Sequence, residues 1–214
     1  MRPFHRSRAA QAVHKTSRTA RRPSRCAPGL RITILFSLLL AIPAACGNSA
    51  LKSAQSPDPS QSGFRIESSA FKEGAFIPAR FSCQGENVSP SLKWTDPPAG
   101  TRSLALIVDD PDAPGGTWTH WVVFNLPAQT RAMDENAPKG DELPKGGLQG
   151  LTSFGSVGYG GPCPPPGKAH RYFFKLYAAD TSLSLKPGTA REEVVAALKG
   201  HTLGEAQLMG RFKR

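Results

Sequence analysis

The feature that most restricts the fold is a series of short apolar runs separated by turn residues. SLALIVDD (103–110), HWVVFNLP (120–127) and RYFFKLYAAD (171–180) are rich in β-branched and aromatic residues, and Pro, Gly or Asp bounds each of them. Runs of this length and composition are typical of buried β-strands rather than of helices. The earlier stretch FRIESSAF (64–71) alternates, which predicts a strand with Phe64, Ile66 and Ser68 on one face.

One segment, TAREEVVAALKG (189–200), carries the signals of a helix. Thr189 followed by Glu192 forms a capping-box pattern, and Gly200 suits the C-terminal end. Many strands with one or two late helices predict a mainly β fold: a two-sheet antiparallel β-sandwich with helices at an edge. Residues 131–151 are polar and rich in Gly and Pro, so we expect a long surface loop there.

Charge sets the N-terminal part of the chain apart. Of the 27 Lys and Arg residues, nine lie in residues 1–31, which contain no acid, and the other 18 face 16 acidic residues. The formal net charge of +11 therefore comes mostly from the first 31 residues. The nearly neutral remainder argues against a nucleic-acid partner.

The stretch ITILFSLLLAIPAA at 32–45 has no charge. It is shorter than the roughly 20 residues of a spanning helix, but it fits a signal-peptide h-region behind the basic n-region 1–31. Ala44-Ala45-Cys46-Gly47 resembles a bacterial lipobox, although Pro43 stands where that motif usually has leucine.

The N-terminal pattern predicts three parts of the chain and a location. They are a signal peptide (1–45), a flexible Ser/Pro/Gln-rich tether (46–63) and a folded domain (64–214). Lipidation of Cys46 would anchor the protein in the membrane of the cell envelope, facing the periplasm or the exterior. Cleavage near Ala45 without lipidation, giving a secreted or periplasmic soluble protein, remains the alternative, and a retained membrane anchor is the third.

Polar residues gather where the predicted strands begin and end. Asp110, Asp112 and Pro114 follow SLALIV, His120 opens the next run, and His170 precedes RYFFKLYAAD. The two carboxylates are candidates for orienting a histidine, or they belong to an Asp-Pro turn that caps itself. An X-Pro bond in this turn is compatible with the cis form. Spacing alone leaves open whether the histidines meet or are separate structural residues.

Four motifs in order resemble the phosphatidylethanolamine-binding protein family, in its bacterial Raf kinase inhibitor-like branch. They are FSCQGENVSPSLKW, DDPDAP, HWVVFNLP and GYGGPCPPPGKAHRY, and the likeness extends over 64–214. It implies a two-sheet β fold with a small pocket for phosphate or a phosphoryl head group such as phosphorylethanolamine. Matched motif by motif, the resemblance implies pocket positions at Asp110, Pro114, His120, Gly161, Pro162, His170 and Tyr172. In the family, the bond before the proline that matches Pro114 is often cis.

The glycine- and proline-rich motif then acquires an expected role. Gly160 and Gly161 would turn backbone N–H groups toward an anion, while the prolines hold the wall rigid. His120 and His170 would donate hydrogen bonds to the ligand, and Asp110 would accept one from the far nitrogen of a histidine. The competing hypothesis is a rigid crossover loop without a binding role.

The resemblance implies a non-catalytic binding protein that requires no cofactor. The alternatives are a protein-level inhibitor or regulator of a protease or kinase, and a weak hydrolase of phosphorylated small molecules. The sequence lacks a serine elbow, a Walker loop and zinc-ligand spacing, so no metal is expected. Cys83 and Cys163 would form a disulfide in an oxidising compartment or remain free thiols. A homodimer is a further expectation from the bacterial relatives.

Overall fold

A computed structural model describes residues 63–214. The expected signal peptide, the lipidated Cys46 and all but the last residue of the tether lie outside these described residues. Within the described part of the chain, no helix is long and apolar enough to cross a membrane.

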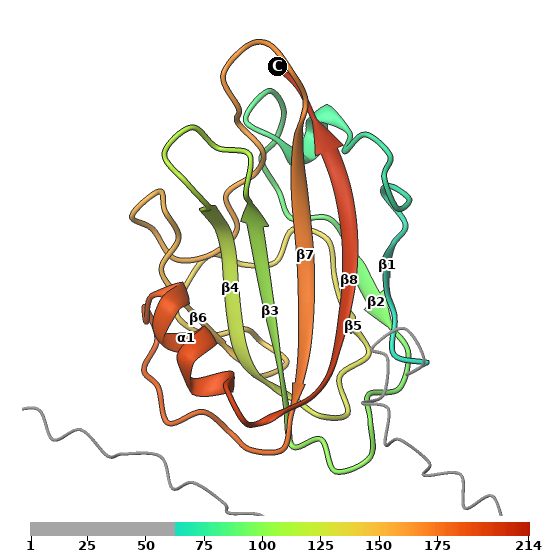
Figure 1. The fold of residues 1–214 in the computed structure, drawn as a ribbon, viewed down its shortest axis with the longest axis vertical. Helices are drawn as coiled ribbons and strands as arrows, with labels where there is room; N and C mark the ends of the chain where they lie inside the picture. Colours follow the sequence, from blue (N-terminus) through green and yellow to red (C-terminus); the bar gives the residue numbers. More distant parts are fainter. Residues whose placement is uncertain (1–62) are drawn as a thin grey trace, which may run out of the picture. The chain divides into compact units, whose positions relative to one another are not determined.

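Two antiparallel sheets form the domain, and this confirms the predicted mainly β sandwich (Figure 1). The smaller sheet has the order β1-β2-β5, with the bounds Ile66–Ser68, Leu92–Trp94 and Ala132–Met133. The larger has the order β6-β4-β3-β7-β8, with the bounds Leu148–Gln149, Trp118–Pro127, Ser103–Asp110, His170–Ala179 and Thr202–Phe212. A short 3-10 helix, η2 (Ala79–Phe81), and one α-helix, α1 (Arg191–Leu198), complete the described elements.

The central strand β3 is buried on both faces, which explains why its sequence is apolar without alternation. Leu106 and Val108 belong to the cluster between the sheets, together with Trp94 of the smaller sheet. Ile107 faces the opposite side and belongs to a second cluster that includes Val194 of α1. The sandwich therefore has a main core between its sheets and a smaller core under the helix.

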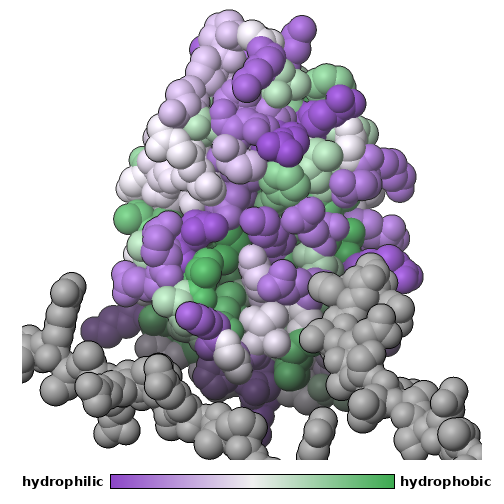
Figure 2. Space-filling model, viewed as in Figure 1, coloured by the Kyte–Doolittle hydropathy of each residue, from purple (hydrophilic) through white to green (hydrophobic). Residues whose placement is uncertain are grey.

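The helix differs from its prediction in two respects. It begins at Arg191 with Ala190 as N-cap and no side-chain cap, and the Thr189 hydroxyl donates to Lys186 O instead. The capping-box prediction was therefore wrong. The helix also covers the outer face of the larger sheet beside β4, rather than its edge (Figure 1). Figure 2, in the same view, shows hydrophobic residues at the surface beside α1.

The predicted surface loop at 131–151 was wrong in part, because both of its ends form strand pairs. β5 joins the smaller sheet, and β6 borders the larger one. Gln149 is fully buried, where its amide accepts from Trp121 Nε1 and donates to two backbone carbonyls. Strands of two residues are too short to show a sequence period, so the composition of the intervening loop dominated the prediction.

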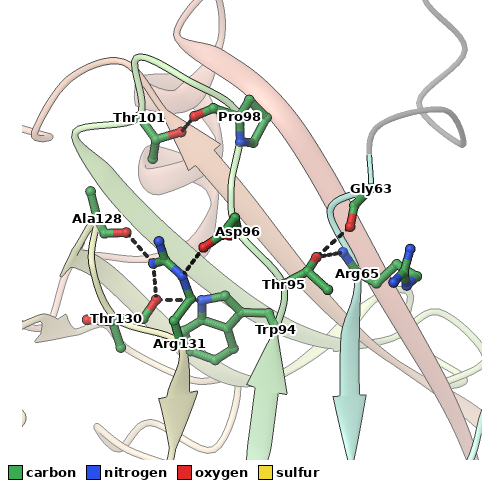
Figure 3. A network of polar contacts seen from close by, with 10 residues as sticks. All are labelled: Gly63, Arg65, Trp94, Thr95, Asp96, Pro98, Thr101, Ala128, Thr130 and Arg131. Atoms are coloured by element: carbon green, nitrogen blue, oxygen red, sulfur yellow. Dashed lines mark hydrogen bonds and ion pairs between the residues drawn. The ribbon is translucent and has the colours of Figure 1, made fainter.

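Polar side chains tie together one end of the smaller sheet (Figure 3). Thr95 accepts from the Arg65 backbone N–H and donates to Gly63 O. Arg131 donates to Asp96 and to two backbone carbonyls, and Trp94 Nε1 donates to Thr130 O. These bonds hold the start of the described chain against β2 and the segment that leads into β5.

Candidate functional site

A β-bulge in β4 determines which side chains reach the candidate site. Val108 of β3 pairs with Trp121, but the next residue, Asp109, pairs with Thr119, so His120 is an extra residue on β4. Bulges re-aim side chains and are frequent beside functional sites. Strict alternation would place His120 and Trp121 on opposite faces. With the bulge, His120 is not turned to the opposite face. It reaches the Tyr172 ring, with the ring centroids 5.1 Å apart, and Trp121 stays in the main core, to which Tyr172 also belongs.

His170 and Asp110 come together because the antiparallel strands β3 and β7 are neighbours. Asp110 ends β3 and His170 begins β7, so both lie at the same end of the sheet, near the C-terminus in Figure 1. His170 Nδ1 lies 2.8 Å from Asp110 Oδ2, and both side chains are buried. This is the carboxylate–histidine contact that the sequence predicted for Asp110.

A cavity of about 200 Å3 opens at this end of the domain. Its floor consists of five buried residues, and its rim of six residues that are partly or largely exposed. The floor residues are Asp110, His120, Pro164, His170 and Tyr172. The rim residues are Ala113, Pro114, Trp118, Phe154, Cys163 and Pro165. The structure thus brings together five of the seven predicted site residues: Asp110, Pro114, His120, His170 and Tyr172.

The histidine hydrogen bonds leave one nitrogen of each ring for the cavity. His120 Nδ1 lies 2.7 Å from Gly160 O, and since a carbonyl only accepts, Nδ1 carries the proton. The carboxylate of Asp110 likewise accepts from His170 Nδ1. Nε2 is therefore the free nitrogen on both rings. Burial lowers the pKa of His120, partly offset by its bond to Gly160 O and by the charge of Asp110, so its neutral form is favoured without a ligand.

The Tyr172 hydroxyl lies near the Asp110 carboxylate, but no hydrogen bond of acceptable geometry joins the two groups. Among residues 63–214 this hydroxyl is the one buried side-chain oxygen or nitrogen without a hydrogen-bond partner. Burial, followed by the charge of Asp110, raises the pKa of Tyr172, so the hydroxyl keeps its proton. A buried hydroxyl without a partner costs free energy, and this one belongs to a residue of the cavity floor.

The sequence allowed Asp112 to orient a histidine, but in the structure it does not. Its carboxylate accepts from the backbone N–H of Arg171 and from two guanidinium nitrogens, at 2.8 to 3.0 Å. The Arg171 hydrogen bond lowers the pKa of Asp112 to about 2. Asp110 has both roles that were considered, because its Oδ1 also accepts from Asp112 N–H, as in a self-capping turn.

The predicted anion nest at Gly160 and Gly161 was wrong, because both N–H groups already have protein acceptors. Gly160 donates to His120 O, and Gly161 donates to Asn87 Oδ1. Close packing is what requires these glycines: a Cβ at Gly161 would lie 2.3 Å from Phe81 O, and one at Gly160 would lie 2.6 Å from the Phe154 ring. Gly161 and Pro162 do not line the cavity.

The proline-rich wall is tied by a disulfide to the turn that follows η2. Cys83 and Cys163 are bonded across a separation of 80 residues, with their Cα atoms 5.4 Å apart. Cys83 N–H also donates to Pro162 O. The wall is therefore cross-linked rather than held by proline stiffness alone.

Among residues 63–214 every peptide bond is trans, so the bond before Pro114 differs from the cis expectation.

A buried ion pair beneath the bulge was missed at the sequence level. Asp109 is almost fully buried and accepts from Arg191 Nε and from the Thr119 hydroxyl. Arg191 Nη2 lies 3.1 Å and Lys175 Nζ 3.9 Å from its Oδ2. The two consecutive aspartates thus point to opposite faces of β3, as strand alternation requires: Asp110 to the cavity and Asp109 to the start of α1.

Comparison with known proteins agrees with this architecture. The sequence profile described as "Phosphatidylethanolamine-binding protein" matches residues 67–213. The chain belongs to the phosphatidylethanolamine-binding protein family. The family resemblance inferred from the motifs is thereby confirmed.

Members from distant organisms align over the same part of the chain. A "UPF0098 protein" from Methanothermobacter thermautotrophicus is 51% identical over 149 residues, which is 70% of this chain and 98% of that protein. A "UPF0098 protein" from Aquifex aeolicus is 50% identical over 151 residues, 70% of this chain and 88% of the relative. The matched part is thus nearly an entire protein in the first of these relatives.

Two solved structures share the fold. YbcL of Escherichia coli, described as a member of the mammalian PEBP family, superposes with a TM-score of 0.68 at 34% identity, covering 72% of this chain and 99% of YbcL. A phosphatidylethanolamine-binding protein homolog from Chlamydia trachomatis gives 0.65 at 39% identity, covering 71% and 98%. These family members confirm the sandwich fold predicted from the sequence.

Proposed function

We propose that this protein is a non-catalytic binding protein whose cavity takes phosphate or the phosphoryl group of a small molecule. The observation that carries the proposal is the convergence on one cavity floor of His120, His170 and the unpartnered hydroxyl of Tyr172. The hydroxyl is a donor, and each imidazole becomes a donor at Nε2 when protonated. Donors on the buried floor of a small cavity suit an oxyanion.

The lining favours binding over turnover. Its described residues include no serine or threonine, and its cysteine, Cys163, is bonded to Cys83. A hydrolase with this lining would have to use a histidine, Asp110, Tyr172 or an activated water as its nucleophile, and the Asp110 carboxylate already accepts from His170 and from Asp112 N–H. Both histidine rings are fixed through Nδ1, which holds them in place to receive a ligand.

The proposed location is the cell envelope, where Cys46 carries a lipid anchor. The signal-peptide pattern at 1–45 and the lipobox-like sequence support export. The Cys83–Cys163 disulfide supports an oxidising compartment. In this setting the ligand would be a phosphoryl compound outside the cytoplasm.

NMR titration of the histidine ring signals tests the binding proposal. We expect saturable shifts at His120 and His170 when inorganic phosphate or phosphorylethanolamine is added, because both rings belong to the cavity floor. His170→Gln should weaken binding at least tenfold by removing one charge-assisted hydrogen bond, which contributes roughly 1.5–3 kcal/mol. Residues 63–214 suffice for the experiment, since the Methanothermobacter relative consists almost entirely of the matching region.

His201 provides the matched control for His170. Its Nδ1 also lies 2.8 Å from an aspartate, Asp180, but this pair is exposed and away from the cavity. His201→Gln should leave phosphate affinity unchanged. Equal losses in the two variants, or no shift at either cavity histidine with any of the ligands, would contradict the proposal.

Binding of a non-titrating anion should strengthen as the pH falls. Burial holds the pKa of His120 below its ordinary value, near 6.5. Neutral His120 therefore predominates at pH 7, and acidification below about 6.5 adds a second N–H donor at Nε2. Dimethyl phosphate keeps a single charge over this range, so its affinity reports on the protein. Calorimetry should show affinity rising toward low pH with proton uptake, and His120→Gln should flatten this dependence. A pH profile that His120→Gln leaves unchanged would assign it to another group.

A further inference from the structure

We propose that the rim of the cavity selects the organic substituent of the phosphoryl ligand, and that it prefers a neutral aromatic or planar group to an ammonium group. The inference rests on the proposed function, because the phosphoryl group must occupy the floor for its substituent to reach the rim. It adds a ligand class: phosphate monoesters whose substituent is an aromatic ring.

The rim presents two partly exposed aromatic side chains. Trp118 is 39% exposed and Phe154 is 45% exposed. They come from different parts of the chain, the start of β4 and the turn after Leu151, yet their rings pack edge to face with centroids 5.5 Å apart. Phe154 also lies edge to face against His120, at 5.3 Å. The substituent of a phosphoryl group bound beside His120 therefore meets aromatic surface first.

Phe154 is held in place before any ligand binds. The Thr152 hydroxyl donates to Ser156 O and accepts from Phe154 N–H, which closes a tight turn. Two hydrogen bonds join Ser153 to Thr119: Ser153 N–H donates to Thr119 O, and Thr119 N–H donates to Ser153 Oγ. The turn is thus fixed to the same bulge that aims His120. A prebuilt aromatic contact costs little ordering entropy when a ligand binds.

The charges around the rim disfavour an ammonium substituent. Asp110 is the one carboxylate in the lining, and it already accepts from His170 and from Asp112 N–H. Asp112 is paired with Arg171. The Arg214 guanidinium lies 3.7 Å from the Cys163 sulfur, which belongs to the rim. A cation at the rim would therefore find no free carboxylate among the described lining residues, and it would face a positive charge of the protein.

Three probes test the inference on the full chain: inorganic phosphate without an organic substituent, phenyl phosphate with an aromatic one, and phosphorylethanolamine with an ammonium group. Calorimetry should show phenyl phosphate binding roughly tenfold more tightly than phosphorylethanolamine, the size that aromatic contacts allow. Tighter binding of phosphorylethanolamine would overturn the inference, because attraction of its ammonium group to the ring faces would then dominate. If none of the three binds, the proposed function fails as well.

Leucine variants separate aromatic contact from simple apolar bulk. Trp118→Leu and Phe154→Leu should each reduce the ratio of phenyl phosphate affinity to phosphate affinity several-fold, and together about tenfold. Phe76→Leu is the matched control, since Phe76 is 53% exposed and packs against Arg211 outside the cavity lining. An unchanged ratio in the double variant would overturn the inference and leave the phosphate-binding proposal standing.

Tryptophan fluorescence gives an independent measurement. The chain contains three tryptophans, of which Trp94 and Trp121 are buried and Trp118 is exposed, so acrylamide quenching reports mainly on Trp118. Saturating phenyl phosphate should protect Trp118 from quenching more than saturating inorganic phosphate does. Equal protection by the two ligands would show that the substituent does not reach the rim, and it would overturn the inference.

Discussion

Replacing Arg191 with methionine should lower the free energy of unfolding by about 3 kcal/mol, at the lower end of what breaking a buried ion pair costs. Asp109 is 1% exposed and would lose the guanidinium contacts at 3.1 to 3.2 Å. Lys175 at 3.9 Å and the Thr119 hydroxyl would remain as partners, which is why the larger values are not expected. Urea unfolding followed by circular dichroism measures the change.

Arg80→Met is the matched control for this variant. Arg80 forms ion pairs with Glu86 and Glu135, but its side chain is 50% exposed. Exposed pairs contribute about 0–1 kcal/mol, so Arg80→Met should change stability much less. Arg191→Lys should lie between the two, since lysine keeps the charge and loses the planar fork. Similar losses for Arg191→Met and Arg80→Met would mean that the buried pair adds nothing beyond a surface pair.

Removing the disulfide is expected to have the second large effect. Cys83→Ser with Cys163→Ser should lower the free energy of unfolding by about 2–5 kcal/mol, because a long closed loop restricts the unfolded chain. The two cysteines are 80 residues apart in sequence. Phosphate binding should weaken as well, since Cys163, Pro164 and Pro165 all line the cavity. Thermal unfolding and the histidine titration, with and without reductant, measure both effects.

The variant also controls for non-specific effects of the reductant. Reductant should shift the unfolding of the unmodified protein toward that of the double serine variant, and it should leave the variant itself unchanged. Equal stability of the oxidised protein and the variant would contradict the expected role of the cross-link. Retained phosphate affinity in the variant would show that the prolines hold the wall without it.

The sequence predicted β1, β3, β4 and β7 because their apolar or alternating runs match buried surfaces, but it missed β2 (Leu92–Trp94) and β8 (Thr202–Phe212), which contain no long apolar run. SLALIVDD became β3, with Ile107 under the helix and Leu106 in the main core. The alternating stretch placed Phe64, Ile66 and Ser68 on the buried side, as predicted. The helix start was missed because a Thr-x-x-Glu pattern does not distinguish a cap from a hydroxyl that bonds backward to Lys186 O.

The motifs could predict which residues belong to the site, but not the contacts between residues that are distant in sequence. The family resemblance located Asp110, His120 and His170, but the anion nest that was expected at Gly160 and Gly161 was wrong. Their role depends on Phe81 O, Asn87 and Phe154, which are distant in sequence. The aromatic rim was missed for the same reason, because Trp118 and Phe154 meet only in the folded chain. The Asp109–Arg191 contact spans 82 residues, and no sequence spacing indicates it.

The bulge at His120 has a genetic consequence. The extra residue is accommodated at one point in β4, while Trp121 and the residues after it keep their partners in the sheet. Deleting a single codon here would restore regular pairing at this point of the β3–β4 pair, so local pairing with and without a histidine presented to the cavity are one insertion or deletion apart. A cavity histidine of this kind can therefore be gained or lost in evolution in one step, without rebuilding the core beneath it.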